Sequence, residues 1–426
     1  MTITVFLATL LITMGFGVPI AFALLISGAI MMLQLGMFDA QIIAENVIHG
    51  ADSYPLLAIP FFLLAGEIMT VGGLSRRLIN LAITLVGHVH GGLGYVTILA
   101  AVMMAAVSGS AVADAAMLTA LLLPMMVSAG HDPARSAGLI SASSIIAPVV
   151  PPSIGFIIFG VTANVSISRL FMAGIFPGLM LGLALCVTWW WWLTRTERIA
   201  PRVRGSAKDV WKAFRQAIFA LGLPVIIIAG LKMGMFTPTE AGVIAAVYAL
   251  IISMFVYREL TLVQLYNACA DAARTSAVVM FLVAAAAVSA WLITVANVPQ
   301  QVIGLLEPLI DNPIILMMAI MILVMFVGTA LDLSPTILIL VPVLMPLVKT
   351  AGIDPVYFGV LFMINCAIGL ITPPVGVVLN TVAGVGKMKM DRVVSGVMPF
   401  MIAQFVLMFL LVLFPWLVTG PARLFH

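Results

Sequence analysis

The chain contains several stretches of roughly 20 apolar residues with almost no charged side chains, which is the length that an α-helix needs to cross a membrane. Hydrophobic residues make up 63% of its 426 positions and charged residues only 8%, whereas a soluble domain carries about 25% charged residues. The sequence therefore predicts an all-α polytopic membrane protein. The clearest apolar stretches are 170–193, 212–232, 237–257, 274–296 and 392–418.

Charge and motif content exclude several other classes of protein. The net charge of +3 is small and scattered, so no nucleic-acid partner is expected. Cys186, Cys269 and Cys366 stand alone in apolar segments, without metal-ligand spacing. No nucleotide-binding loop, zinc-protease motif or Ser/His/Asp arrangement occurs. We therefore expect neither ATP hydrolysis nor enzyme catalysis, and no organic cofactor.

Basic residues indicate which parts of a membrane protein face the cytoplasm. The segment 195–215 holds seven Lys and Arg residues against Glu197 and Asp209, and we expect it to be a cytoplasmic loop. Residues 1–35 exceed one crossing at about 1.5 Å per residue, so a turn or a kink is expected near 15–19. Trp189–Trp192 is typical of an aromatic belt at the membrane boundary.

The second half of the chain repeats the proline and glycine positions of the first half at an offset of 222 residues. Pro124 corresponds to Pro346, and AGHDP (129–133) corresponds to AGIDP (351–355). The pair Pro151-Pro152 corresponds to Pro373-Pro374. All membrane helices share Leu, Ile and Val, but not fixed Pro and Gly positions. The repeat therefore predicts two homologous halves, packed as an inverted repeat of the kind common in secondary transporters.

This repeat predicts scaffold helices, two re-entrant hairpins and two broken helices, with about ten or eleven transmembrane helices in total. The hairpins, 92–128 and 312–350, are expected to enter from opposite sides of the membrane. Short amphipathic stretches at 38–49, 75–90 and 299–311 are expected to lie along its surface. The predicted segments are 1–91 (scaffold helices and an interfacial arm), 92–165 (first hairpin and broken helix), 166–311 (scaffold helices with the loop 195–215), 312–388 (second hairpin and broken helix) and 389–426 (a C-terminal scaffold helix).

Each half carries a candidate site made of a hairpin tip and a proline-broken helix. The tips are VSGSAVAD (107–114) and VGTALDLSPT (327–336). Proline removes a backbone donor and interrupts a helix, which leaves carbonyl groups that are tolerated at membrane depth only inside protein or beside a watery cavity. Carbonyl and hydroxyl oxygens suit a hard cation, and helix N-termini favour an anion.

Sodium fits this set of ligands, because oxygen atoms can bind it without a dedicated charge. The first predicted sodium site comprises the hydroxyls of Ser108 and Ser110 and the carbonyls of Ala147 and Val150, shaped by Pro152. The second comprises Gly328, Ala330 and Asp332, facing Gly369, Thr372 and Pro374.

Simpler interpretations stay open for the same residues. Small residues such as Ser and Gly also allow close packing of membrane helices, and a proline pair can be a plain kink. Asp114 and Asp332 are the strongest single signals, because carboxylates inside membranes are costly and usually functional. Asp114 could instead be a solvated residue near the hairpin mouth, and Glu67 could simply bond across helices.

Five segments together resemble the large membrane subunit of tripartite ATP-independent periplasmic (TRAP) transporters of bacteria. The resemblance covers essentially the whole chain. The segments are LLAIPFFLLAGEIM (56–69), SGSAVADAA (108–116), IIAPVVPPSI (145–154), MFTPTEAG (235–242) and INCAIGLITPPVG (364–376).

The resemblance implies a bacterial inner-membrane protein that works by an elevator mechanism. Sodium would move with an organic acid, of the C4-dicarboxylate or sugar-acid type, delivered by a periplasmic substrate-binding protein. A separate small membrane subunit of about four helices would extend the scaffold within the membrane lipid. The sodium ligands carry over as named above, although Ala147 stands where a glycine is expected. The substrate site implied comprises Ser108, Gly109, Ser110, Ala111, Asp114, Pro151, Pro152, Ser153, Thr329, Thr372, Pro373 and Asn380.

Two alternative functions stay open. A self-sufficient ion or dicarboxylate symporter could use the same architecture, and dependence of uptake on a binding protein would distinguish the two. An intramembrane enzyme is the alternative from another class, and the missing catalytic constellation argues against it.

Overall fold

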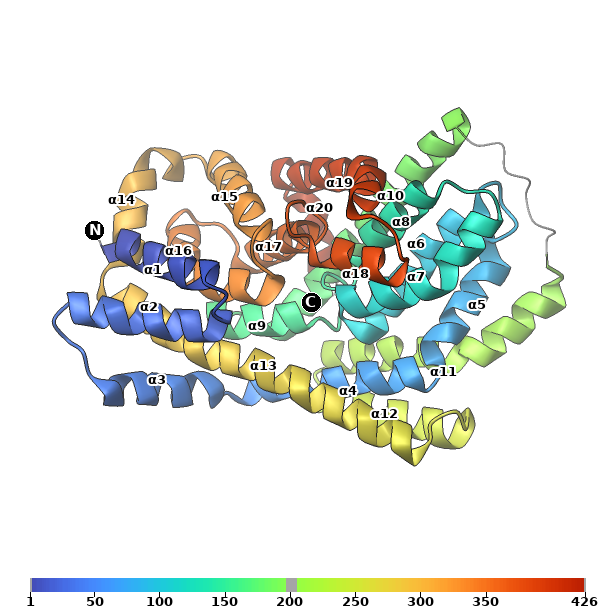
Figure 1. The fold of residues 1–426 in the computed structure, drawn as a ribbon, viewed down its shortest axis with the longest axis horizontal. Helices are drawn as coiled ribbons and strands as arrows, with labels where there is room; N and C mark the ends of the chain where they lie inside the picture. Colours follow the sequence, from blue (N-terminus) through green and yellow to red (C-terminus); the bar gives the residue numbers. More distant parts are fainter. Residues whose placement is uncertain (1, 197–204, 425–426) are drawn as a thin grey trace.

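The computed structural model describes residues 2–196 and 205–424, which form helices joined by turns and, over these ranges, no strand (Figure 1). This confirms the predicted all-α class. The first half comprises α1 (Thr2–Gly15), α2 (Ile20–Gln34), α3 (Ala40–Ala51), η1 (Tyr54–Leu57), α4 (Ala58–Val71), α5 (Leu74–Val86), α6 (Gly92–Ser108), α7 (Ala111–Ser128), α8 (Pro133–Ser144), α9 (Ile154–Ala163) and α10 (Ile167–Thr196). The second half comprises α11 (Ala207–Lys232), α12 (Pro238–Ile251), η2 (Ile252–Val256), α13 (Leu262–Val295), α14 (Val298–Ile310), α15 (Pro313–Gly328), α16 (Leu333–Thr350), α17 (Pro355–Gly369), α18 (Val377–Val385), α19 (Met390–Leu413) and α20 (Trp416–Leu424).

The repeated AGxDP sequences start the two broken helices. The Asp132 carboxylate accepts a hydrogen bond from the Arg135 N–H at 2.8 Å, and Asp354 caps α17 in the same way. Pro133 and Pro355 occupy the first helical position, where the missing N–H costs nothing. The repeat thus places equivalent helix starts in both halves.

Element bounds follow the 222-residue offset well beyond the matched prolines. Adding 222 to α6 gives 314–330, against 313–328 for α15, and adding it to α5 gives 296–308, against 298–310 for α14. The hairpin α6–α7 therefore corresponds to α15–α16, and α8–α9 to α17–α18. The segment α3–η1–α4 corresponds to one continuous 34-residue helix, α13.

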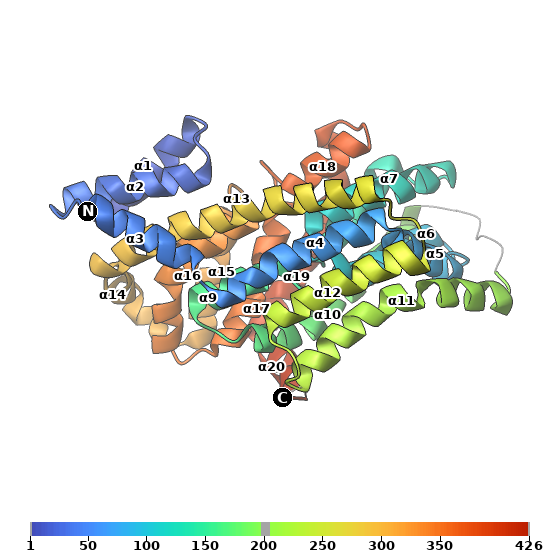
Figure 2. The same cartoon turned by 90° about the horizontal axis from the view of Figure 1, so that it is seen from below.

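Four long helices form a layer along one side of the molecule. Figure 2 shows α13, α4, α12 and α11 running side by side in that order. Helix α3 packs against α13, and α5 packs against α11. We call α1–α5 and α11–α14 the scaffold layer.

The hairpins and broken helices interlock beside this layer. Helix α9 packs on α16, and the equivalent helix α18 packs on α7, so each half contributes to the environment of the other. Helix α19 packs on α8, and α10 packs on α19, α6 and α17. The expected grouping assigned α10 and α19 to the scaffold segments. Helix α10 also packs on α20, and α19 also packs on α17 and α18.

Eight helices in the described ranges are long and apolar enough to cross a membrane by length and composition, and shorter apolar helices accompany them. Residues 2–34 form two helices, α1 and α2, which pack on each other around a turn. Helices α3, α5 and α14 form at the predicted amphipathic stretches. The predicted loop 195–215 is shorter than expected, because α10 extends to Thr196 and α11 begins at Ala207. Positions 197–204 lie outside the described residues.

The expectation that Trp189 belongs to an interfacial belt is wrong. Its side chain is fully buried, and its indole N–H donates a hydrogen bond to the Gly91 carbonyl at 3.1 Å. Its ring lies against those of His131 and Phe400. The neighbouring Trp190 is exposed, because successive helical residues point about 100° apart.

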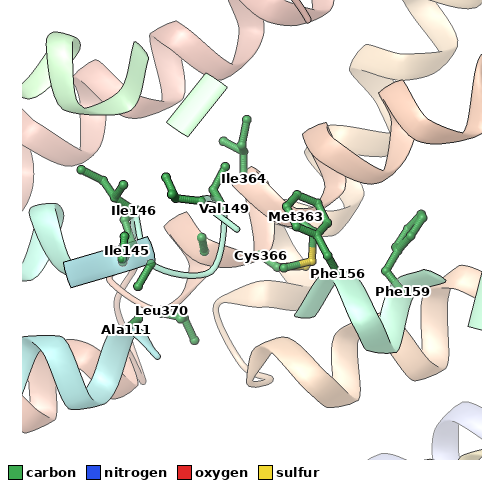
Figure 3. Close-up of a cluster of buried hydrophobic side chains, with 14 of the residues drawn as sticks. Ala111, Ile145, Ile146, Val149, Phe156, Phe159, Met363, Ile364, Cys366 and Leu370 are labelled. Atoms are coloured by element: carbon green, nitrogen blue, oxygen red, sulfur yellow. The ribbon is translucent and has the colours of Figure 1, made fainter. Parts of the chain in front are cut away.

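The first break is embedded in an apolar core, which Leu370 and Ile371 at the start of the second break also join. Ile146 and Val149 of the first break, Phe156 of α9, and Met363 of α17 belong to a single cluster of buried side chains (Figure 3). Close packing of this kind holds the irregular backbone between the two halves in a fixed conformation.

Candidate functional site

The first break, residues 145–153, is a buried irregular segment between α8 and α9. Backbone N–H groups of Ile146 and Ala147 bond back to Ser143 and Ser144 at 3.2 Å. The Pro151-Pro152 peptide is cis. In this part of the described chain no hydrogen bond reaches the carbonyls of Ala147 and Val150. These two oxygens, like other carbonyls of this break, have no hydrogen-bond donor within the described residues.

The second break, residues 370–376, has the same plan but is partly open. The Thr372 N–H bonds to the Gly369 carbonyl at 3.0 Å, and its hydroxyl donates to the Ile368 carbonyl at 2.8 Å. The Pro373-Pro374 peptide is cis, and Pro374 is exposed. Within the described residues no hydrogen bond reaches the carbonyls of Thr372 and Pro374.

Each hairpin tip touches the break of its own half. A Cβ atom added to Gly109, whose φ is +60°, would lie 2.7 Å from the Pro152 carbonyl oxygen. A Cβ atom added to Gly369 would lie 2.7 Å from the Gly328 carbonyl oxygen. The structure therefore places each tip in contact with its break at Pro152 and at Gly369, and the two predicted sodium-ligand sets stay predictions.

Serine hydroxyls organise the first tip and break. Ser110 caps α7 by accepting from the Ala113 N–H at 3.4 Å, and its own N–H donates to the Ser108 hydroxyl oxygen at 3.3 Å. Ser153 caps α9 and donates its proton to the Pro148 carbonyl. Both helices therefore direct their N-termini at the point where tip and break meet.

Asp114 is the polar side chain of the site whose burial is least offset by hydrogen bonds. It lies in the first turn of α7, its side chain is only 1% exposed, and neither carboxylate oxygen has a hydrogen-bond partner. The Ser108 hydroxyl lies close to it. Burial excludes the alternative in which Asp114 is solvated at the hairpin mouth.

The remaining predicted residues are bonded within their own elements. Asp332 is exposed and caps α16 by accepting from the Leu333 N–H at 2.8 Å. Thr329 donates to the Phe326 carbonyl at 2.8 Å, and the exposed Asn380 donates to the Val375 carbonyl at 2.9 Å. Asp332 therefore differs from Asp114 in being solvated.

The two halves meet beside these residues. A Cβ atom on Gly155 would lie 2.9 Å from the Leu333 side chain, so the start of α9 lies against the start of α16. Ser153 and Asp332, the N-caps of those two helices, are thereby brought to the same junction. The described residues contain no group of three or more His, Cys, Asp or Glu side chains, so the site offers single carboxylates, hydroxyls and carbonyls.

Sequence analysis missed two buried polar residues, Ser143 and Asn365. The Ser143 hydroxyl and the Asn365 side-chain carbonyl are buried without a hydrogen-bond partner, in the last turns of α8 and α17 before the breaks. The Asn365 amide donates to the Met321 carbonyl at 2.6 Å. The two positions are 222 residues apart, and this offset was the signal that could have identified them.

The fold and its paired tip-and-break sites define a helical membrane protein built from two equivalent units. Residues 7–417 match the family described as the DctM component of the tripartite ATP-independent periplasmic transporter. The 2,3-diketo-L-gulonate TRAP transporter large permease protein YiaN of Escherichia coli is 54% identical, over 99% of each chain. The C4-dicarboxylate TRAP transporter large permease protein DctM of Pseudomonas aeruginosa is 34% identical, over 92% of this chain and 91% of that protein.

The chain therefore belongs to the DctM family of TRAP transporter large permease proteins, as the resemblance predicted. It is a multi-pass protein of the bacterial inner membrane. The crystal structure of the Alcanivorax borkumensis YdaH transporter shares the fold, with a TM-score of 0.63 over 90% of each chain at 16% identity.

Proposed function

We propose that this chain imports an organic acid by sodium-coupled symport, with the ion bound where each tip meets its break. The buried, unpartnered carboxylate of Asp114 carries this proposal. An isolated ionised carboxylate in a dry site is very costly. A cation that also takes oxygens from Ser108, Ser110 and the carbonyls of the first break would offset that cost.

The substrate is an organic anion. Helices α7, α9, α16 and α18 begin at the tips and breaks, so four positive helix ends are available for carboxylate groups. No Lys or Arg occurs among the proposed site residues. Relatives named for 2,3-diketo-L-gulonate and C4-dicarboxylate transport support a small acid as cargo.

The transport step is an elevator movement of the hairpin and broken-helix unit against the scaffold layer. The two halves contact that layer differently. The first hairpin meets α4 and α5 through its first arm, α6, whereas the second hairpin meets α13 and α14 mainly through its second arm, α16. The two halves of an inverted repeat are equivalent. A state in which their hairpins contact the scaffold layer differently therefore implies a second state, in which each hairpin makes the contacts that the other makes in the first state.

Helices α10 and α19 move with this unit, in place of the scaffold role first assigned to them. Gly174 and Gly178 of α10 sit against Val149 and Val150 of the first break. Arg135 of α8 donates to the Gly396 carbonyl of α19 at 3.0 Å. Sliding α8 past these partners would break close backbone contacts.

The driving force is the electrochemical gradient of sodium, to which the membrane potential contributes about 2.3 kcal/mol per charge per 100 mV and the sodium concentration ratio contributes the rest. A periplasmic binding protein supplies the affinity for dilute acid, and a small four-helix subunit extends the scaffold. Relatives carry the name TRAP transporter large permease protein, which supports both partners. The expected surroundings are membrane lipid.

Reconstitution in proteoliposomes tests the proposal. We expect uptake of 2,3-diketo-L-gulonate or a C4-dicarboxylate only when the binding protein, the small subunit and an inward sodium gradient are all present. Uptake that persists after collapse of the sodium gradient, or rapid uptake by this chain alone, would contradict the proposal.

A further inference from the structure

The first break begins three residues earlier in its half than the second break does in the other half. Helix α8 ends at Ser144, whereas α17 ends at Gly369, and subtracting 222 from 369 gives Ala147. Pro148 accounts for this difference, because the repeat has Leu370 at the equivalent position. A proline lacks the N–H that would continue the helix, and its ring clashes with the carbonyl four residues before it, here that of Ser144.

The early end of α8 deprives the Ala142 carbonyl of its helical donor. In a continuing helix this carbonyl would accept from the Ile146 N–H. The backbone tightens instead, and the Ile146 N–H donates to the Ser143 carbonyl at 3.2 Å. In the second half the equivalent carbonyl is that of Ile364, and its donor, Ile368, still lies within α17. A buried carbonyl without a donor is costly, so the first half needs a donor that the second half does not need.

Gln404 of α19 supplies that donor. Its side-chain amide donates to the Ala142 carbonyl at 2.9 Å, and both residues are fully buried. The repeat-equivalent contact would pair Gly182 of α10 with Ile364 of α17, and Gly182 has no side chain with which to donate. The two differences between the halves, Pro148 and Gln404, therefore occur together: one removes a hydrogen bond and the other replaces it.

Helix α19 is a firm support for this hydrogen bond, because it packs closely on α8 (Figure 1). A Cβ atom added to Gly138 would overlap the Gly396 backbone, and the Arg135 guanidinium donates to the Gly396 carbonyl at 3.0 Å. Arg135, Gly138 and Ala142 are spaced by three and four residues, so they share one face of α8. Ala142 is the last of the three before the break.

We propose that Gln404 is a positioning residue for sodium at the first break. Its amide bonds to the tightened turn and not to a proposed ligand. By satisfying the Ala142 carbonyl, it holds the turn that leads directly into the Ala147 and Val150 carbonyls. The inference rests on the proposed function, in which these carbonyls bind the ion. Stability alone does not account for Gln404, since its own side-chain oxygen is buried without a partner and that cost offsets the hydrogen bond it donates.

Gln404→Met tests this role, because it keeps the length of the side chain and removes the amide. The probe is sodium chloride, titrated against potassium chloride at constant ionic strength, and the readout is the melting temperature of the full chain. The apparent dissociation constant for sodium should rise roughly five- to tenfold, the factor that corresponds to one net hydrogen bond. Gln404→Asn, whose amide is one methylene too short for the Ala142 carbonyl, should give the same rise.

Tyr357→Phe is the matched control. The Tyr357 hydroxyl donates to the Leu411 carbonyl at 3.0 Å, so it also joins α19 to a broken helix, but about three turns before the second break. This variant should lower the melting temperature in the absence of sodium and leave the dissociation constant unchanged. An unchanged constant in both Gln404 variants, or an equal rise in Tyr357→Phe, would overturn the proposal.

Uptake into proteoliposomes gives a second readout. In Gln404→Met the sodium concentration for half-maximal uptake should rise, while the maximal rate at saturating sodium stays near that of the native chain. A fall in the maximal rate alone would indicate a merely structural role and would overturn the proposal. If the native chain showed no sodium response, the proposed function would fail and this inference with it. A native sodium response that Gln404→Met leaves unchanged would overturn only the role of Gln404.

Discussion

At the scale of single residues, Asp114 and Asp332 separate two situations that look alike in the sequence. Both are carboxylates at a hairpin tip. Asp332 is solvated and caps its own helix, whereas Asp114 is buried without a hydrogen-bond partner. The difference comes from helix phase: Asp114 lies in the first turn of α7 on its buried side, and Asp332 precedes α16. The spacing of residues in the sequence predicts where the hairpin tips lie. It does not predict which side of each tip packs against protein.

Asp114→Asn should reduce the stabilisation of the protein by sodium. The wild-type melting temperature should rise with sodium, because a ligand that binds only the folded state adds about 2.7 kcal/mol at 100 times its Kd. The amide carries no charge for a cation to neutralise, so the rise in melting temperature with sodium over potassium should shrink to the part contributed by the second site. Asp391→Asn, in the exposed first turn of α19, is the control. A full sodium response in Asp114→Asn would refute the assignment.

Glycine contacts at the tips give a second prediction at this scale. Alanine at Gly109 or Gly369 would meet a backbone carbonyl at 2.7 Å, so each variant should lose about 1–3 kcal/mol of unfolding free energy and most of its uptake. Alanine at Gly384, a helical position with nothing within 4 Å, should instead stabilise by about 0.5–1 kcal/mol. Denaturation and uptake assays on the three variants check this. Equal effects at all three positions would mean that tip and break do not touch.

At the scale of elements, the hairpins and broken helices were predictable, because Pro, Gly and Asp act locally. Pro133 and Pro355 begin helices, and the double prolines lie in the breaks that follow those helices. Packing was not predictable, since lipid tails are as apolar as Leu and give no signal for which helix faces protein. The burial of Trp189, the continuous α13 and the neighbours of α10 and α19 all depend on that missing information.

The link between α5 and the end of η2 gives a prediction for element packing. The Arg77 guanidinium donates to Glu259 at 2.7 Å and lies 3.6 Å from the centre of the Tyr257 ring. Arg77→Lys loses the planar stacking and should cost about 1 kcal/mol of unfolding free energy. Arg76→Lys is the control, because Arg76 is largely exposed and 4.0 Å from Glu259. Equal costs for the two variants, measured by chemical denaturation, would contradict this link.

The same link has a defined pH dependence. The hydrogen bond from Arg77 holds the pKa of Glu259 below its ordinary value of 4.5. A carboxyl group whose folded pKa is depressed stabilises the fold above its unfolded pKa and loses that contribution as the pH falls. The difference in unfolding free energy between wild type and Glu259→Gln should thus be present at pH 7 and fade below pH 4.5. A difference that is constant across this window would exclude an ionic contribution.

At the scale of the whole molecule, the two halves have the same elements but unequal surroundings. The first break is fully buried, whereas Pro374 of the second is exposed. Helix α16 packs on α13, whereas α7 has no comparable packing on α4 or on α13. One state of a two-state movement would place equivalent sequences in different environments in this way. The contacts of the other state then follow from the contacts of this one, by adding or subtracting 222 from each residue number.

Two pairs of introduced cysteines test whether the two halves exchange their contacts with the scaffold layer. The background for both pairs lacks Cys186, Cys269 and Cys366. His49→Cys with Lys349→Cys joins two residues that line one cavity in the present arrangement. Subtracting 222 from 349 gives Val127, and adding 222 to 49 gives Asp271, so Val127→Cys with Asp271→Cys is the equivalent pair. A bifunctional reagent that links the first pair should also link the second, but in a different population of molecules. Linking the first pair should stop uptake and prevent linkage of the second when all four cysteines are present. Both links forming in one molecule, or uptake that continues after the first link, would show that the hairpin unit does not move as the repeat requires.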